Sequence, residues 1–195
     1  MEYGTTRQTP MAAGAQVGAR VEQDEVVDKP YKSLVGCLLY PSQWCRPDLS
    51  YAVGALSQVM AGASKNHWDM GIDVVRYLKG TKDMELTYQR HENNNMDVVA
   101  YADSDFANDK LDGKSIYGYV VFVGGNAVSW KSKKAQTTAT STTIAEIDAV
   151  YHSATECKWI AEFLVSLGIQ RNANFKVYSD NQSAIKVLMG EKYLD

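Results

Sequence analysis

Residues 98–105 have the sequence Val98-Val99-Ala100-Tyr101-Ala102-Asp103-Ser104-Asp105, an apolar run that stops at acidic residues. Residues 175–180, Phe-Lys-Val-Tyr-Ser-Asp, repeat this pattern and stop at Asp180. Apolar, β-branched runs that end in turn-forming residues are typical of buried strands, so each stretch is expected to present a carboxylate at its C-terminal end. With two further apolar runs, the sequence predicts a mixed sheet of about four strands, at 98–101, 118–124, 127–131 and 175–179.

A third acid, Glu146, lies between these strands in a predicted helix. Residues 141–143, Ser-Thr-Thr, are natural N-cap residues. Apolar residues then recur at helical spacing, which predicts that the face beside Glu146 is buried; they are Ile144, Ile147, Val150, Tyr151 and Ala154. Separate helices are expected over 159–167 and after Asp180.

The order of the three acids suggests a chemistry that none of them suggests alone. A single Asp after a strand is common in turns, a Glu in a first helical turn complements the dipole, and Asp180 followed by Asn181 is a good helix cap. Carboxylates from separate elements at one sheet end, however, can hold Mg²⁺ against a phosphodiester, with Mn²⁺ as an alternative. The sequence therefore predicts a two-metal hydrolase in which Asp103 bridges both ions and Glu146 and Asp180 each complete one site.

A set of strings extends along most of the chain, in a fixed order. They are Tyr31-Lys32-Ser33-Leu34-Val35-Gly36-Cys37-Leu38-Leu39-Tyr40, Arg46-Pro47-Asp48-Leu49-Ser50-Tyr51-Ala52-Val53, His67-Trp68, Arg76-Tyr77-Leu78-Lys79-Gly80-Thr81, Tyr101-Ala102-Asp103-Ser104-Asp105, Gly118-Tyr119-Val120, Val128-Ser129-Trp130-Lys131-Ser132-Lys133-Lys134, Ala145-Glu146 and Asp180-Asn181-Gln182-Ser183-Ala184. Together they resemble the C-terminal part of a copia-type retrotransposon Pol polyprotein, from the end of the reverse transcriptase palm onward.

This resemblance implies a ribonuclease H-like α/β domain that hydrolyses the RNA strand of RNA–DNA hybrids with Mg²⁺. Asp103, Glu146 and Asp180 match the family's catalytic and metal-binding acids, and Asp105 is either a supporting carboxylate or a solvated turn residue. The implied partners are an RNA–DNA hybrid and an upstream reverse transcriptase palm. The family continues into a further strand and a terminal helix that carry a fourth acid, and this chain stops short of both.

The expected organisation has three parts. Residues 1–30 form a loosely ordered leader, residues 31–88 a small helical segment that resembles a thumb or connection region, and residues 96–195 the ribonuclease H-like domain without its last strand and helix. In the helical segment Ser64 is expected to cap a helix, His67 to be a capping or surface residue, and Trp68 and Tyr77 to be core residues. The missing strand favours an alternative function, a catalytically silent remnant that binds nucleic acid or another protein through its open sheet edge.

The charge distribution gives only local hints of a nucleic-acid partner. With 20 Lys and Arg residues against 23 Asp and Glu residues, the formal net charge is −3, so overall charge does not indicate nucleic-acid binding. Lys131, Lys133 and Lys134 follow a predicted strand, and Lys110 and Lys114 lie in the turn after the first acid. We predict that they contact phosphates, although lysines that guard a sheet edge are an equally good interpretation.

Cysteine use and hydropathy bear on the compartment. Cys37, Cys45 and Cys157 are odd in number and lack Cys-x-x-Cys spacing, which is typical of a reducing compartment. The sequence starts without the apolar core of a secretory signal, and no apolar run approaches the ~18 residues of a membrane span. We therefore expect a cytoplasmic or nuclear protein that is not secreted and has no membrane partner.

Overall fold

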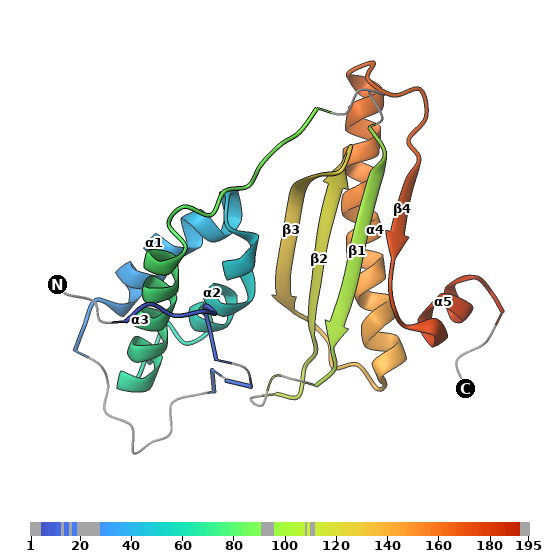
Figure 1. Cartoon of the computed structure of the whole chain (residues 1–195). Helices are drawn as coiled ribbons and strands as arrows, with labels where there is room; N and C mark the ends of the chain where they lie inside the picture. Colours follow the sequence, from blue (N-terminus) through green and yellow to red (C-terminus); the bar gives the residue numbers. More distant parts are fainter. Residues whose placement is uncertain are drawn as a thin grey trace. The chain divides into compact units, whose positions relative to one another are not determined.

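The computed structural model describes residues 5–12, 14–15, 17–18, 28–90, 96–107, 109 and 112–191 (Figure 1). Half of the predicted leader (residues 1–4, 13, 16 and 19–27) and Lys110 lie outside these residues. The chain divides into two compact units, Met1–Leu86 and Thr87–Asp195, which are described separately below. In the described part of the chain, no helix is long and apolar enough to cross a membrane.

The first unit is helical. It contains α1 (Tyr31–Trp44), the 3-10 helix η1 (Pro47–Leu49), α2 (Ser50–Ser57) and α3 (Lys65–Gly80). Buried apolar side chains from all four elements form one core, namely Tyr31, Val35, Leu38, Leu49, Ala52, Val53, Leu56, Val59, Ala63, Val74 and Tyr77. Trp68 packs against this core, so the interpretation of Trp68 and Tyr77 as core residues is confirmed.

A buried arginine joins η1 to the end of α3. Arg46, 7% exposed, donates from Nε and Nη2 to the carboxylate of Asp48, with its shortest contact at 2.7 Å. It also donates to the carbonyl oxygen and the hydroxyl of Thr81, at 3.2 and 2.7 Å, and its guanidinium lies over the Tyr77 ring. Two strings far apart in the sequence, around residues 46–48 and 77–81, therefore form one structural feature.

The N-terminus of α3 has the predicted cap. Ser64 and His67 form a capping box in which the Ser64 N–H donates to His67 Nδ1 at 3.0 Å. The other ring nitrogen, Nε2, lies 3.0 Å from the carbonyl oxygen of Gly18, which fixes the N–H on Nε2. His67 is thus a buried capping residue, and the expected capping role is confirmed.

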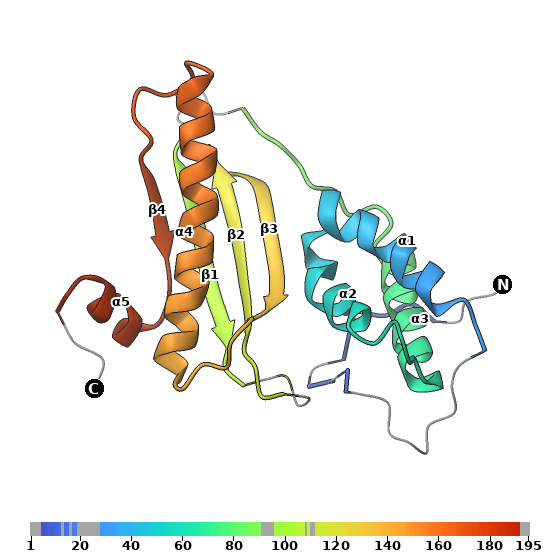
Figure 2. The same ribbon diagram turned by 180° about the vertical axis from the view of Figure 1, so that it is seen from behind.

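The second unit is a mixed four-stranded sheet with helices. Its strands are β1 (Val98–Asp105), β2 (Ile116–Val123), β3 (Asn126–Lys134) and β4 (Phe175–Tyr178), in the order β3-β2-β1-β4. β1 pairs antiparallel with β2 and parallel with β4, and β2 pairs antiparallel with β3. The helix α4 (Thr142–Ser166) lies along one face of the sheet (Figure 2), and α5 (Gln182–Leu188) follows β4. This arrangement confirms the predicted α/β class and is consistent with a ribonuclease H-like fold.

Side-chain alternation assigns one sheet face to α4. Residues on the α4 side of β1 and β2, together with Ala135 after β3, are buried. They form a core with small and apolar residues of the helix: Val98, Ala100, Ala102, Tyr117, Tyr119, Val121 and Ala135 with Ala149, Cys157, Ile160, Ala161 and Leu164. On the opposite face, Tyr101 stacks on Tyr178 with ring centroids 5.3 Å apart and meets the Phe122 ring edge-on at 5.9 Å. Tyr101 is 57% exposed, so this face is open within the described residues.

Two sequence expectations about these elements are wrong. The helix predicted over 159–167 is not separate, because α4 runs without interruption from Thr142 to Ser166 and contains neither Gly nor Pro. The strand predicted over 98–101 continues to Asp105, because β2 supplies hydrogen-bonding partners as far as Ile116. Asp103 therefore lies within a strand and not beyond its end.

Candidate metal centre

Asp103 lies where β1 extends past its parallel neighbour. The last pair between β1 and β4 is Tyr101 with Tyr178, so β4 does not flank Asp103 on that side. On the other side Asp103 is opposite Gly118 of β2, which has no side chain. The Asp103 carboxylate is exposed and has space on both sides, which leaves it free to approach groups from other elements.

Asp180 is placed by the turn that starts α5. Asn181 is the N-cap of this helix, and its side-chain oxygen accepts a hydrogen bond from the Ala184 N–H at 2.9 Å. Because Asn181 performs the capping, the Asp180 carboxylate is not needed for it. Asp180 remains exposed two residues after the end of β4.

Glu146 comes from α4, beyond its first turn. Ser141 caps this helix by accepting a hydrogen bond from the Ile144 N–H at 3.2 Å. No acid lies in the first turn, so Glu146 is not a dipole-complementing residue there. Glu146 is only 7% exposed, and its Oε2 atom is buried without a hydrogen-bond partner among the described residues. A buried carboxylate oxygen without a partner is costly, which indicates that a cation or water belongs beside it.

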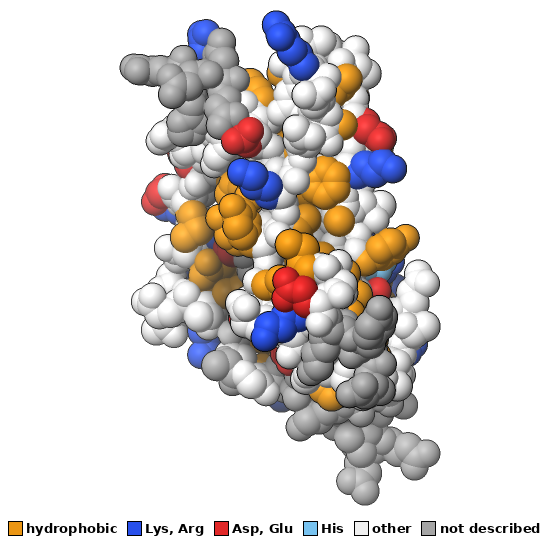
Figure 3. Space-filling view, turned by 90° about the vertical axis from the view of Figure 1, so that its right-hand side faces the viewer, with side chains coloured by type: hydrophobic (Ala, Val, Ile, Leu, Met, Phe, Trp, Pro, Cys, Tyr) orange, Lys and Arg blue, Asp and Glu red, His pale blue; other side chains and the backbone are white. Residues whose placement is uncertain are grey.

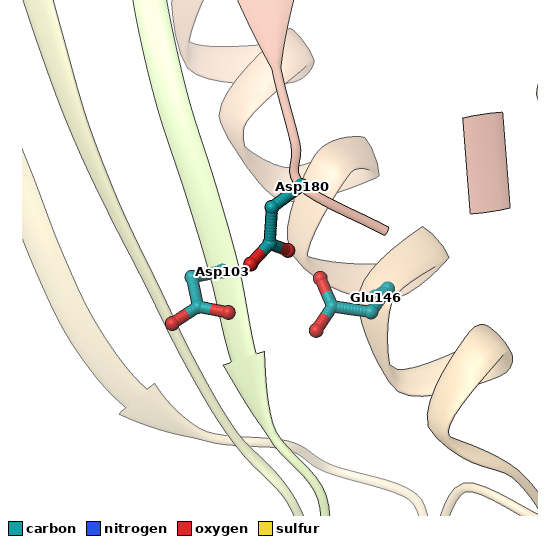
Figure 4. Close-up of side chains that lie close together, drawn as sticks. All are labelled: Asp103, Glu146 and Asp180. Atoms are coloured by element: carbon teal, nitrogen blue, oxygen red, sulfur yellow. The ribbon is translucent and has the colours of Figure 1, made fainter. Parts of the chain in front are cut away.

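The three carboxylates converge, as Figure 4 shows. One oxygen from each of Asp103, Glu146 and Asp180 lies within 4.8 Å of the other two. Burial raises the pKa of Glu146, and the nearby charges of Asp103 and Asp180 raise it further, whereas the backbone of Ser104 opposes this shift. A divalent cation would relieve both the burial penalty and the mutual repulsion.

The composition of this group decides which ions fit it. All of its ligand atoms are carboxylate oxygens, which hard cations such as Mg²⁺ and Ca²⁺ prefer, and it has no thiol or imidazole of the kind that Zn²⁺ usually takes. The residues therefore fit a hard divalent cation. Asp105 is exposed at the end of β1 and is not part of this group.

The predicted phosphate-binding lysines fall into two kinds. Lys134 pairs with Asp109 at 2.7 Å and Asp112 at 3.0 Å, and Lys114 pairs with Asp112 at 3.5 Å. These carboxylates lie in the connection between β1 and β2. The side chain of Asp109 is only 7% exposed, so its ion pair with Lys134 is largely shielded from water. Lys131 and Lys133 are exposed and point to the other face of β3 from Lys134.

The sequence did not indicate this ion-pair network. Asp109 and Asp112 lie in a turn, where acids are common, and Lys134 is more than twenty residues away along the chain. The network forms because β3 returns alongside β2, which brings the end of β3 next to the start of β2: Lys134 is paired with Ile116.

Comparison with known proteins identifies relatives among retroelements. The chain is 37% identical over 176 residues to the retrovirus-related Pol polyprotein from transposon RE2 of Arabidopsis thaliana, across 90% of the chain and 12% of that protein. It is 33% identical over 191 residues to the retrovirus-related Pol polyprotein from transposon TNT 1-94 of Nicotiana tabacum, across 95% of the chain and 14% of that protein. The secreted RxLR effector protein 161 of Plasmopara viticola is 37% identical over 131 residues, which are 67% of the chain and 91% of that protein. No protein-family model and no solved structure matches the chain.

The strand order is consistent with a ribonuclease H-like fold, and the three converging carboxylates form an acidic group that can hold a metal ion. The chain belongs to the copia-type family of retrovirus-related Pol polyproteins. It spans about an eighth of the length of the Pol polyproteins that it matches, which are covered to 12% and 14%.

Proposed function

We propose that this chain hydrolyses the RNA strand of RNA–DNA hybrids as part of retroelement reverse transcription. The observation that carries this proposal is the convergence of Asp103, Glu146 and Asp180 within 4.8 Å, with a buried oxygen of Glu146 left unpartnered among the described residues. The membership of the chain in a Pol polyprotein family supports a role on nucleic acid. The ribonuclease H-like strand order supports phosphodiester hydrolysis as the reaction.

The residues have distinct roles in this proposal. When bound, two Mg²⁺ ions lower the pKa of an attacking water and stabilise the leaving oxygen. Asp103, from the interior strand β1, is the residue proposed to hold both ions. Glu146 would supply a buried ligand from the helix, and Asp180 would supply an exposed ligand, as Asp103 does.

Substrate contacts are proposed for the lysines of β3. Lys131 and Lys133 are exposed and suit phosphate contacts. Lys114 and Lys134 are proposed to contact phosphates less directly, because their ammonium groups already pair with Asp109 and Asp112. The helical unit Met1–Leu86 is proposed to be a thumb or connection segment that acts with an upstream reverse transcriptase palm, by the likeness of its strings to that family.

The test is cleavage of a fluorescent RNA–DNA hybrid with Mg²⁺ and with chelator. Metal-dependent cutting of the RNA strand is expected, and the Asp103→Asn protein is expected to lose it. Glu162→Gln is the matched control, because Glu162 is an exposed acid on the same helix as Glu146. Hybrid cleavage that survives unchanged in the Asp103→Asn protein would contradict the proposal.

A second function is supported by the surface around β4. No strand pairs with the outer edge of β4 among the described residues, so its backbone groups can receive another strand. Figure 3, which views the right-hand side of Figure 1, shows apolar side chains gathered there, and Tyr178, Leu188 and Met189 of the β4–α5 region are 49%, 51% and 74% exposed. We propose as the alternative a catalytically silent binding module, which tight hybrid binding without cleavage, unaffected by Mg²⁺ and by the loss of Glu146, would support.

A further inference from the structure

A second buried oxygen without a hydrogen-bond partner among the described residues belongs to the residue that follows Asp103. Ser104, which follows Asp103 in β1, has its Oγ atom buried and unpartnered among the described residues, as is Glu146 Oε2. The alternation of β1 puts Ser104 on the same face as Ala102, which packs in the core under α4. The hydroxyl of Ser104 therefore lies on the side of the strand from which Glu146 comes.

The backbone of Ser104 already connects two of the acids. Its N–H donates to Asp103 Oδ1 at 2.8 Å. The backbone of Ser104 also lowers the pKa of Glu146, against the larger effects of burial and of the neighbouring charges. The main chain of Ser104 is thus near enough to act on the Glu146 carboxylate, while its side-chain hydroxyl makes no hydrogen bond within the described part of the chain.

Other shielded serines of this chain satisfy their hydroxyls. Ser42 Oγ donates to the Leu39 carbonyl at 2.8 Å, Ser153 Oγ to the Val150 carbonyl at 2.8 Å, and Ser129 Oγ to Glu156 at 2.8 Å. Such local bonds are the usual way in which a buried hydroxyl is satisfied. A serine in a helix can donate to a carbonyl of the preceding turn. Ser104 lies in a strand that pairs with β2, where no such carbonyl is within reach of its hydroxyl.

We propose that Ser104 is a positioning residue of the metal centre, whose hydroxyl holds a water molecule that is shared with Glu146 Oε2 and with the bound divalent cation. A buried water needs at least two polar partners, and these two oxygens supply them. Groups that orient the ligands of a metal ion are commonly worth about 10–100-fold in metal affinity. This inference rests on the proposed function, because it assigns a role within the same site.

The test is calorimetric titration of the metal-free 195-residue chain with Mg²⁺ and with Mn²⁺, which measures binding without any substrate. Ser104→Ala is expected to bind about tenfold more weakly than wild type. Ser104→Thr keeps the hydroxyl and is expected to restore wild-type affinity. Ser166→Ala is the control, because Ser166 is exposed at the end of α4 and bonds only the Phe163 carbonyl among the described residues.

The outcomes separate the two proposals. Equal affinity of the Ser104→Ala and wild-type proteins overturns the role of Ser104 and leaves the metal centre standing. Failure of the wild-type protein to bind either ion overturns the metal centre and, with it, the role of Ser104. If alanine unfolds the protein, Ser104→Cys preserves the volume with a much weaker donor, and full affinity of this variant likewise overturns the inference.

Discussion

Replacing Glu146 by glutamine should stabilise the metal-free protein, although most substitutions at buried positions destabilise. Glu146 is 7% exposed, and its carboxylate lies within 4.8 Å of two other carboxylates. At 4.8 Å, two unit charges repel by about 1 kcal/mol at the dielectric constant of water and by about 3.5 kcal/mol at an effective value of about 20. Because Asp103 and Asp180 are exposed, the lower figure applies to each pair.

The neutral amide of the Glu146→Gln protein therefore removes about 2 kcal/mol of repulsion, from which about 1 kcal/mol is lost because a buried amide lacks a partner. The net gain of about 1 kcal/mol corresponds to a rise of roughly 5 °C in the unfolding temperature of a unit of this size. Saturating Mg²⁺ should make the wild-type protein the more stable of the two. The ion at about 100 times its Kd stabilises the wild-type protein by about 2.7 kcal/mol, whereas the variant lacks one of the carboxylates that bind it.

The pH dependence gives an independent check with a defined sign. The pKa of Glu146 is raised in the folded protein above its ordinary value of 4.5. At a pH between the pKa of Glu146 in the unfolded protein and its higher pKa in the folded protein, the folded state holds a proton that the unfolded state releases. The free energy of unfolding therefore falls as the pH rises from the lower pKa to the higher one. The Glu146→Gln protein should lack this decrease in the absence of metal.

Thermal unfolding by circular dichroism at about pH 8, in chelator and in Mg²⁺, measures the stability change of the metal-free variant and its reversal by the ion. Glu162→Gln is the control on an exposed part of α4. A Glu146→Gln protein that is less stable than wild type in chelator would refute the reasoning, because it would mean that the carboxylate is better satisfied without a metal ion than the geometry indicates. An unchanged response of the variant to Mg²⁺ would refute the assignment of Glu146 as a ligand.

Three further predictions concern other parts of the molecule. Arg46→Met should destabilise the helical unit by roughly 3 kcal/mol in urea unfolding, because it leaves the Asp48 carboxylate without its partner; a loss below about 1 kcal/mol would show that the contacts of Arg46 contribute little to stability. Asn181→Ala should cost about 1 kcal/mol and weaken Mg²⁺ binding, since the cap orients the turn that carries the third acid; unchanged Mg²⁺ affinity in calorimetry would oppose this. Lys131→Gln and Lys133→Gln should each lower the salt dependence of hybrid binding by about one unit of slope, and an unchanged slope would remove these lysines from the interface.

The acidic site could be predicted because its signals are local. Each of the three acids follows a feature that a few neighbouring residues specify: an apolar run before Asp103, the Ser141 cap before Glu146, and an apolar run before Asp180. The structure brings the three together, while their catalytic role stays a prediction. The pairing of Lys134 with Asp109 was beyond sequence reasoning, because it depends on a contact between segments distant in the chain.

The buried face of α4 was predicted only in part, for a physical reason. Tyr151, expected on the buried face, is 66% exposed. The fully buried positions near the start of the helix are instead Ala145, Ala149 and Ser153. Small residues contribute little to a hydrophobic period, so the larger side chains beside them, Ile144, Ile147 and Val150, dominated the pattern although they are only partly buried.

This stripe of small residues also accounts for the geometry of the acidic site. Ala149 of the helix packs in one core with Ala100 and Ala102 of β1, and side chains of this size let a helix approach a strand closely. Glu146 lies one turn before Ala149, so its side chain is long enough to bring its carboxylate near that of Asp103 on β1. The small residues that made the packing face hard to predict therefore also bring the Glu146 carboxylate within 4.8 Å of the carboxylates of Asp103 and Asp180. A larger residue at position 149 would move the helix away from the strand and separate these carboxylates.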